Sequence, residues 1–251
     1  MKKRYLMIYN GQEIRRRFIM LSNKFCRIGI LAGMGPRSTA PFIESVLDEC
    51  ERQYGAKNDI DFPHMIIYSL PTPFHPKEPI IKEDMVKTLQ IGIQSLTEAN
   101  CDFIAVPCNV VHQFYEDMTK MTNVPILNII QETINAIGVQ SSKVGLIGTR
   151  STVENQLYQP YLLNNNKDIY WTERIQSQVD QLIYDVKQNR EMEELIQQWK
   201  NIELDLTENG VTDVVCVCTD LYFCGSYTSL NFFDSSKILA KSLVERYLAF
   251  K

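Results

Sequence analysis

The chain has 251 residues, of which 45% are hydrophobic and 22% are charged, and these fractions are ordinary for a soluble globular protein. Its length allows one large domain or two small ones, each with its own core. The net charge of −4 argues against a nucleic-acid-binding surface, and no apolar run is long enough to span a membrane. We therefore expect neither a nucleic acid nor a membrane as a partner.

The N-terminal segment differs from the rest of the chain in charge. Residues 1–24 contain seven Lys or Arg and one acid, Glu13, whereas acids outnumber bases in the remaining residues. A targeting segment, an arm for an anionic surface and an upstream extension are all compatible with this charge. We favour a basic N-terminal extension, because Met20 lies just before the first clear strand and no long apolar stretch with a small-residue cleavage site marks a secretory signal.

Short apolar runs alternate with amphipathic stretches from residue 26 onward. In the first half these runs predict strands at Cys26–Ala32, His64–Leu70, Asp102–Val106 and Val124–Leu127. A helix should begin near Ser38, whose hydroxyl is expected to cap it. A second helix is predicted by apolar residues that recur every three or four positions, namely Met85, Leu89, Ile93 and Leu96.

The second half shows the same alternation of strands and helices. Strands are predicted at Lys143–Ile147, Asp168–Thr172 and Val211–Val217. Helices are predicted after the loop 148–152, over residues 176–209 and over Ser235–Phe250. Residues 176–209 are rich in Gln and Glu and contain no proline.

This alternation determines the predicted fold. Strands that alternate with helices imply parallel sheets with helices on both faces, and ligands of such sheets bind beyond the carboxyl ends of the strands. A weak internal repeat is also present, because Arg27–Leu31 resembles Lys143–Ile147 and each is followed by a loop with Ser-Thr. We predict the α/β class, with two similar Rossmann-like or flavodoxin-like domains related by a pseudo-twofold axis and an active site in the cleft between them. The predicted domains are 25–125 together with 235–251, and 126–234.

Two of the seven cysteines lie at matching places in the repeat. Asp102–Val106 followed by Cys108 resembles Asp213–Val217 followed by Cys218. Each cysteine ends a predicted strand where a helix is expected to begin, and a helix N-terminus lowers the pKa of a thiol. One such cysteine would more simply be a buried core residue, but two that face each other across a cleft indicate a pair of catalytic thiols.

The other cysteines and the histidines are more ambiguous. Without an export signal, an odd number of cysteines indicates free thiols in the cytoplasm. The spacing of Cys216 and Cys218 is unusual for structural zinc and no second pair accompanies it, so we expect no metal. His112 lies one helical turn after Cys108 and is either close to the same site or a partly exposed helix residue. His75, in a proline-rich loop, could face a ligand.

Four motifs carry a resemblance to a known family. In chain order they are Gly33-Met34-Gly35-Pro36-Arg37-Ser38-Thr39, Pro107-Cys108-Asn109-Val110-Val111-His112, Gly148-Thr149-Arg150-Ser151-Thr152 and Val217-Cys218-Thr219-Asp220-Leu221. From residue 26 to about 249 the sequence resembles the aspartate/glutamate racemase superfamily, and within it the aspartate-racemase branch. Glutamate racemases of the cell-wall type fit less well, because they carry Asp-Ser in place of Gly33-Met34 and a histidine in place of Asp220.

The resemblance implies an amino-acid racemase that needs neither pyridoxal phosphate nor another cofactor, and a frequent homodimer. One of Cys108 and Cys218 would remove the α-proton as a thiolate while the other donates a proton to the opposite face. Inversion at a carbon needs an acid and a base on two sides, and thiols can be tuned for this to a pKa of about 7–8. Asn109 and Thr219 are candidates to hold the carboxylate. Further substrate-binding candidates are Met34, His75, His112, Thr149, Thr152 and Asp220.

Three departures from the family pattern bear on the substrate. Val110 replaces a threonine whose hydroxyl could hold the carboxylate, and Asp220 replaces a glutamate. The loop 71–78 lacks the arginine of a Pro-Asp-Arg motif that binds the side-chain carboxylate of aspartate, and a bidentate clamp is therefore missing. We predict a racemase of aspartate, glutamate or a related amino acid. The alternatives are an isomerase or decarboxylase of the same superfamily, and a non-catalytic amino-acid-binding protein.

Overall fold

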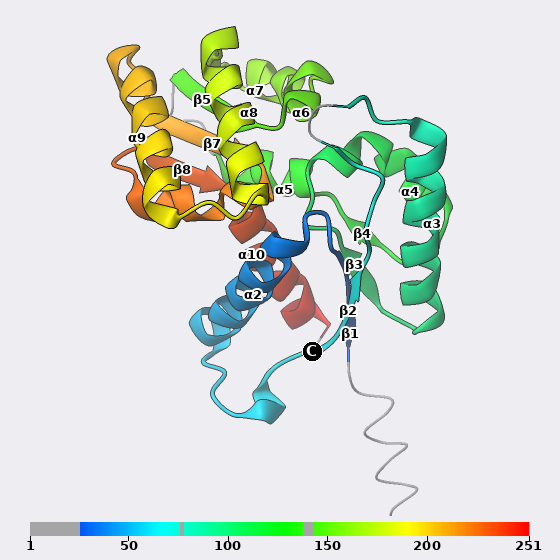
Figure 1. Cartoon of the computed structure of the whole chain (residues 1–251). Coiled ribbons are helices and arrows are strands. Elements are labelled where there is room, and N and C mark those ends of the chain that lie inside the picture. The colour runs from blue at the N-terminus through cyan, green and yellow to red at the C-terminus, as the bar shows by residue number, and fades with distance from the viewer. Residues whose placement is uncertain (1–25, 76–77, 138–142, 251) are drawn as a thin grey trace, which may run out of the picture.

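A computed structural model describes residues 26–75, 78–137 and 143–250 of the chain (Figure 1). Within these residues the strands form two parallel sheets of four strands each, with helices on both sides. The predicted α/β class with two similar halves is confirmed. The basic extension predicted at 1–24 lies outside the described residues, and none of the described helices is long and apolar enough to cross a membrane.

The first sheet is covered on both faces. Its strand order is β2-β1-β3-β4, and its strands are β1 (Arg27–Ala32), β2 (His64–Ser69), β3 (Phe103–Ala105) and β4 (Ile126–Leu127). In the central strand β1, Ile28 and Ile30 pack into one core cluster while Leu31 packs into another. A strand buried on both faces requires a continuous apolar run rather than alternation, and β1 has such a run.

The helices of the first half begin close to where the sequence predicts them. They are α2 (Thr39–Tyr54), α3 (Lys82–Glu98), α4 (Tyr115–Lys120) and α5 (Ile129–Ala136), with short 3-10 helices η1 (Pro36–Ser38), η2 (Asp59–Asp61) and η3 (Val110–Phe114). The predicted apolar face of α3 is completely buried. The expected cap at Ser38 is wrong in one respect, because the Ser38 hydroxyl donates to the Gly35 carbonyl oxygen at 2.9 Å instead of capping α2.

The second sheet repeats the first in strand order and register. Its order is β6-β5-β7-β8, and its strands are β5 (Lys143–Gly148), β6 (Asp168–Tyr170), β7 (Asp213–Val217) and β8 (Asn231–Asp234). Gly29 of β1 pairs with Ile104 of β3, and Gly145 of β5 pairs with Val214 of β7. The sequence repeat therefore corresponds to equivalent strands. Strand β8 was not predicted from the sequence.

The helices of the second half correct one sequence prediction. They are α6 (Arg150–Glu154), α7 (Gln159–Asn164), α8 (Glu173–Lys187) and α9 (Met192–Glu208), followed by η4 (Thr219–Tyr227). The stretch 176–209, predicted to be helical, is interrupted between Lys187 and Met192, because α8 and α9 are separate helices that pack side by side (Figure 1). Asn189 takes a left-handed φ of 57°, and the Arg190 N–H donates to the Asp185 carbonyl at 3.1 Å. This turn follows the end of α8 at Lys187 and reverses the chain.

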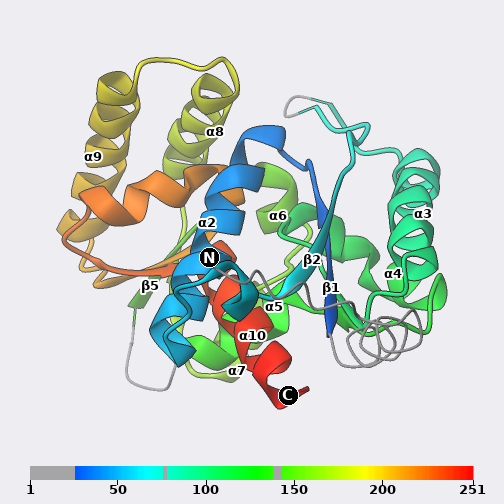
Figure 2. The same cartoon turned by 90° about the horizontal axis from the view of Figure 1, so that it is seen from below.

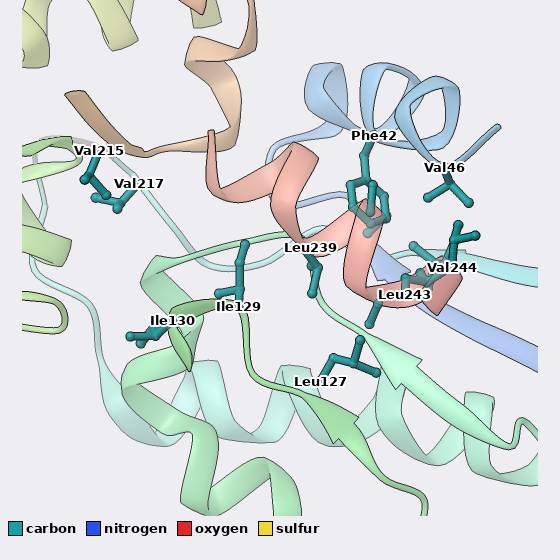
Figure 3. Packing of buried hydrophobic residues seen from close by; sticks show 14 of the residues in the cluster. Phe42, Val46, Leu127, Ile129, Ile130, Val215, Val217, Leu239, Leu243 and Val244 are labelled. Atoms are coloured by element: carbon teal, nitrogen blue, oxygen red, sulfur yellow. The ribbon is translucent and has the colours of Figure 1, made fainter. Parts of the chain in front are cut away.

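The last helix, α10 (Ser235–Ala249), joins the two halves. It follows β8 of the second sheet directly, but it packs against α2 and α5 of the first half (Figure 2). The leucines of α10 lie among Phe42 of α2, Leu127 of β4 and Ile129 of α5 (Figure 3). Val215 and Val217 of β7 belong to the same core cluster, so one apolar core runs from half to half.

The domain boundaries stay a prediction. Strand β4 and helix α5 follow residue 125, but β4 pairs with β3 and α5 packs against α10. Both elements therefore contact the first half, beyond the boundary that we expected at residues 125 and 126.

The core around α10 gives a stability prediction. Leu243 is 0% exposed, so Leu243→Ala is expected to lower the free energy of unfolding by about 2–5 kcal/mol through lost burial and the cavity left behind. Leu204→Ala in α9 is the matched control, because Leu204 is 58% exposed and its loss should change stability by less than about 0.5 kcal/mol. Urea unfolding of both variants measures this, and equal effects would contradict the packing described for α10.

Candidate active site

A cavity of about 240 Å³ lies where the carboxyl ends of strands from both sheets meet. Its wall is made by the loops that follow β1, β2 and β3 in the first half and β5 and β7 in the second, together with the end of α8. The lining residues are Gly33, Met34, Gly35, Pro36, Ser69, Pro71, Thr72, Phe74, Cys108, Asn109, Val110, Val111, Thr149, Thr152, Lys187, Val217, Cys218, Thr219 and Asp220. This is the place where open parallel sheets bind ligands.

The two thiols predicted to be catalytic both line this cavity. Cys108 follows β3 of the first sheet, Cys218 follows β7 of the second, and each residue is 6% exposed. Each precedes a 3-10 helix, since η3 begins at Val110 and η4 at Thr219. The cavity therefore receives one thiol from each half of the repeat.

The expected lowering of the thiol pKa is wrong for the free protein. Burial raises the pKa of Cys108 to about 11, although the backbone N–H groups of Val111 and Val110 lower it. Burial also raises the pKa of Cys218, and the Asp220 carboxylate adds to this effect. The cost of placing a thiolate away from water outweighs the attraction of the short helix N-termini, so both groups are neutral thiols at pH 7.

A partly buried ion pair, which the sequence did not reveal, supplies the charge of the cavity. The Lys187 ammonium lies 2.7 Å from the Asp220 carboxylate, and it sits 5.8 Å from the centre of the Phe74 ring. Burial lowers the pKa of Lys187, but Asp220 outweighs this effect and raises it. Lys187 in turn lowers the pKa of both thiols, whereas Asp220 raises it. Among the described residues that line the cavity, Lys187 and Asp220 are the only charged ones.

The loop after β1 reaches the cavity because of a glycine. Gly33 has a φ of 91°, and a Cβ there would lie 2.5 Å from the backbone nitrogen of Leu70. Only glycine fits this conformation and this close approach of two backbones. The Gly33 N–H donates to the Thr39 hydroxyl at 3.1 Å, which fixes the turn that brings Met34 to the cavity wall.

The predicted polar ligands of the substrate are already part of hydrogen-bond networks. The Asn109 amide donates to the Ser235 hydroxyl at 2.9 Å and accepts from the Tyr158 hydroxyl. The Thr149 and Thr152 hydroxyls lie 2.8 Å apart, and that of Thr219 lies 3.3 Å from the hydroxyl of Ser38. These side chains are therefore held in fixed orientations at the wall.

The two histidines among the predicted ligands do not line the cavity. His112 is 4% exposed, its Nδ1 lies 2.8 Å from the Cys108 carbonyl oxygen, and its Nε2 accepts from the Ile129 N–H at 3.3 Å. Burial lowers the pKa of His112 to about 4, so the ring is neutral and holds the loop behind Cys108. The alternative of a partly exposed helix residue is wrong. His75 is exposed on the surface and lies 3.8 Å from Glu78.

The loop 71–78, which lacks the arginine of the Pro-Asp-Arg motif, contributes Pro71, Thr72 and Phe74 to the wall. Val110, which stands in place of a family threonine, also lines the cavity. No arginine is found among the lining residues that the structure describes. The described chain also contains no cluster of three or more His, Cys, Asp or Glu side chains arranged to hold a metal.

Comparison with known proteins places this chain in a family. Residues 31–227 match the family model described as Asp/Glu/Hydantoin racemase. The chain is 40% identical over 226 residues to a protein of Bacillus subtilis (strain 168) named broad specificity amino-acid racemase RacX. The aligned residues cover 89% of this chain and 99% of that protein.

Solved structures share the fold of this chain. An aspartate racemase from Picrophilus torridus matches with a TM-score of 0.77 and 23% identity, over 88% of this chain and 94% of the other. An aspartate racemase homologue from Pyrococcus horikoshii OT3 matches with a TM-score of 0.71 and 23% identity, over 89% of this chain and 100% of the other. The chain belongs to the Asp/Glu/hydantoin racemase family. It is an amino-acid racemase, and hence an isomerase.

The burial of Cys108 gives a prediction about its titration. The folded protein should ionise this thiol near pH 11, above the ordinary value of 9.0, because the thiolate is poorly solvated. The difference in thiolate absorbance at 240 nm between the native protein and Cys108→Ser measures this midpoint. Circular dichroism at each pH verifies that the protein is folded, and Cys50→Ser, which removes a buried thiol of α2, is the control. A midpoint below pH 8 would contradict the effect of burial.

Proposed function

We propose that the chain racemises free amino acids by a two-thiol proton transfer at Cα. The thiolate of one cysteine takes the α-proton and becomes a thiol, and the C–H electron pair stays on Cα, delocalised into the carboxylate. The thiol of the other cysteine then gives its proton to the opposite face and becomes a thiolate. The observation that carries this proposal is the presence of Cys108 and Cys218, one from each half, in the same buried cavity.

The proposed chemistry needs only groups that the chain itself supplies. A proton leaves one face and another arrives at the opposite face, so neither an electron-accepting cofactor nor a metal takes part in the proposed steps. The carbanion places negative charge on the substrate carboxylate, and donors that are already oriented stabilise it without reorganisation. We propose Asn109, Thr219 and the backbone N–H groups next to them as these donors, because they line the cavity beside the two thiols.

The substrate itself is proposed to activate the first thiol. In the free protein burial keeps both thiols neutral. An amino acid brings an ammonium group, and a positive charge close to a thiol stabilises its thiolate. The Lys187 ammonium at the wall of the cavity also lowers the pKa of both thiols. The first thiol would therefore lose its proton to water mainly in the complex, where the resulting thiolate has an α-proton to remove.

The lining of the cavity supports a range of side chains rather than one. Lys187 can attract a side-chain carboxylate such as that of aspartate or glutamate, but Asp220 already neutralises much of its charge. Apolar groups, among them Met34 and Phe74, occupy other parts of the wall. The Bacillus subtilis relative is named for broad specificity. We propose aspartate, glutamate and related amino acids as substrates, without strict preference for aspartate.

Isotope exchange at Cα tests the proposed function. Single enantiomers of a broad amino-acid panel, incubated in D₂O with the protein, should gain deuterium at Cα and yield the opposite enantiomer on a chiral column. Cys108→Ser and Cys218→Ser should each lower racemisation by about 10²- to 10⁴-fold, since each removes a general acid–base group. Cys50→Ser, away from the cavity, should be as active as the native protein.

The possible results separate the alternatives. A serine variant of either thiol with full activity would contradict the two-base assignment. Exchange of one enantiomer alone by a single variant would agree with it, because one thiol remains. Carbon dioxide release would point to a decarboxylase. Binding measured by calorimetry without any exchange would point to a binding protein.

We also propose that the chain is a homodimer in the cytoplasm. The family resemblance supports the dimer. The thiols support a reducing compartment, because all seven cysteines lie in the described part of the chain and none of them forms a disulfide. Analytical ultracentrifugation at micromolar concentration should give twice the chain mass of 29.1 kDa. A single species of the chain mass would contradict the dimer.

A further inference from the structure

A tyrosine outside the cavity connects the second half to the residue beside Cys108. Tyr158 precedes α7 and is 0% exposed, and it is not among the residues that line the cavity. Its hydroxyl donates to the Asn109 amide oxygen at 2.5 Å. Burial raises the pKa of Tyr158, so the phenol keeps its proton and acts as a donor. A buried phenol requires such a partner, and here that partner belongs to the other half of the molecule.

Asn109 is held at both ends of its amide. The oxygen accepts from Tyr158, and the nitrogen donates to the hydroxyl of Ser235, the first residue of α10, at 2.9 Å. Asn109 is 3% exposed and lines the cavity next to Cys108. An amide nitrogen carries two N–H groups. The group that donates to Ser235 therefore fixes the direction in which the second N–H points.

We propose that Tyr158 is a positioning residue for racemisation, which acts by holding the Asn109 amide so that its N–H meets the substrate carboxylate. This inference rests on the proposed function and adds a residue that never touches the substrate. Tyr158 belongs to the second half and Asn109 to the first, so the hydrogen bond also couples the spacing of the two halves to the orientation of the donor.

The physical effect of the bond should be larger on the intermediate than on the bound substrate. In the carbanion the carboxylate gains negative charge, and a donor in a fixed place stabilises that charge better than one that must turn. Without the Tyr158 hydroxyl the amide oxygen loses a partner in a dry site, and the amide can rotate. The loss should therefore appear mainly in kcat and less in KM.

The test removes one oxygen atom. Tyr158→Phe keeps the ring in the core and is expected to lower kcat/KM for racemisation by about 10- to 100-fold, mainly through kcat. Tyr54→Phe is the matched control, because the Tyr54 hydroxyl also donates to a carbonyl oxygen, that of Asp61, but far from the cavity. Its kcat should stay within twofold of the native value. Thermal unfolding of both variants shows whether they are folded at the assay temperature.

A double variant distinguishes positioning from a general structural role. Asn109→Ala should lower kcat by itself, and Tyr158→Phe added to it should cause no further loss, because the tyrosine acts through the amide. A further loss equal to that in the native background would overturn the proposal. Ser235→Ala, which releases the other end of the amide, should also lower kcat. An unchanged kcat in this variant would show that fixing the amide does not matter and would overturn the proposal even if Tyr158→Phe does not fold.

The result separates this inference from the proposed function. If the native protein exchanges no Cα proton in any amino acid of the panel, the proposed function is wrong and this inference goes with it. If the native protein racemises and Tyr158→Phe is within twofold of it, the proposed function stands and the role of Tyr158 is wrong. A loss of kcat that disappears in the Asn109→Ala background supports both.

Discussion

The packing of α10 against α2 and α5 is the contact on which the rest of the structure depends. The chain leaves the second sheet at β8, and α10 then buries its leucines in a core that also contains residues of the first sheet. With the two halves held together in this way, the carboxyl ends of strands from both sheets open into one cavity. The first residue of α10, Ser235, is hydrogen-bonded to Asn109 beside Cys108. The helix that joins the halves thus also helps to build the site.

Enclosure has opposite effects on the two parts of the proposed reaction. A dry cavity strengthens every interaction with the charge that forms on the carboxylate, and it keeps water away from the carbanion. The same dryness raises the pKa of both thiols and opposes formation of the thiolate. Lys187 opposes this rise in the thiol pKa, but its ion-pair partner Asp220 adds to the rise and has the larger effect on both thiols. The site therefore depends on charge that arrives with the ligand.

The sequence predicted what is periodic or repeated in the chain and missed what depends on distant contacts. The strands, the sheet class and the two cysteines followed from apolar runs and from the repeat. Lys187 carried no signal, because it lies in a Gln- and Glu-rich helix and its partner Asp220 is 33 residues further along the chain. The thiol pKa was predicted with the wrong sign, because a sequence shows the helix N-terminus but not the burial. His112 was expected near the site, but the structure shows it behind the Cys108 loop.

The return of α10 to the first half also affects how the protein forms during synthesis. Residues 26–137 contain β1 to β4, but their core stays incomplete until Leu239, Leu243 and Val244 are available. A ribosome adds those residues only after it has made the entire second sheet. The first half therefore stays only partly packed while the second is translated. The cavity closes around its thiols only once nearly the whole chain has emerged.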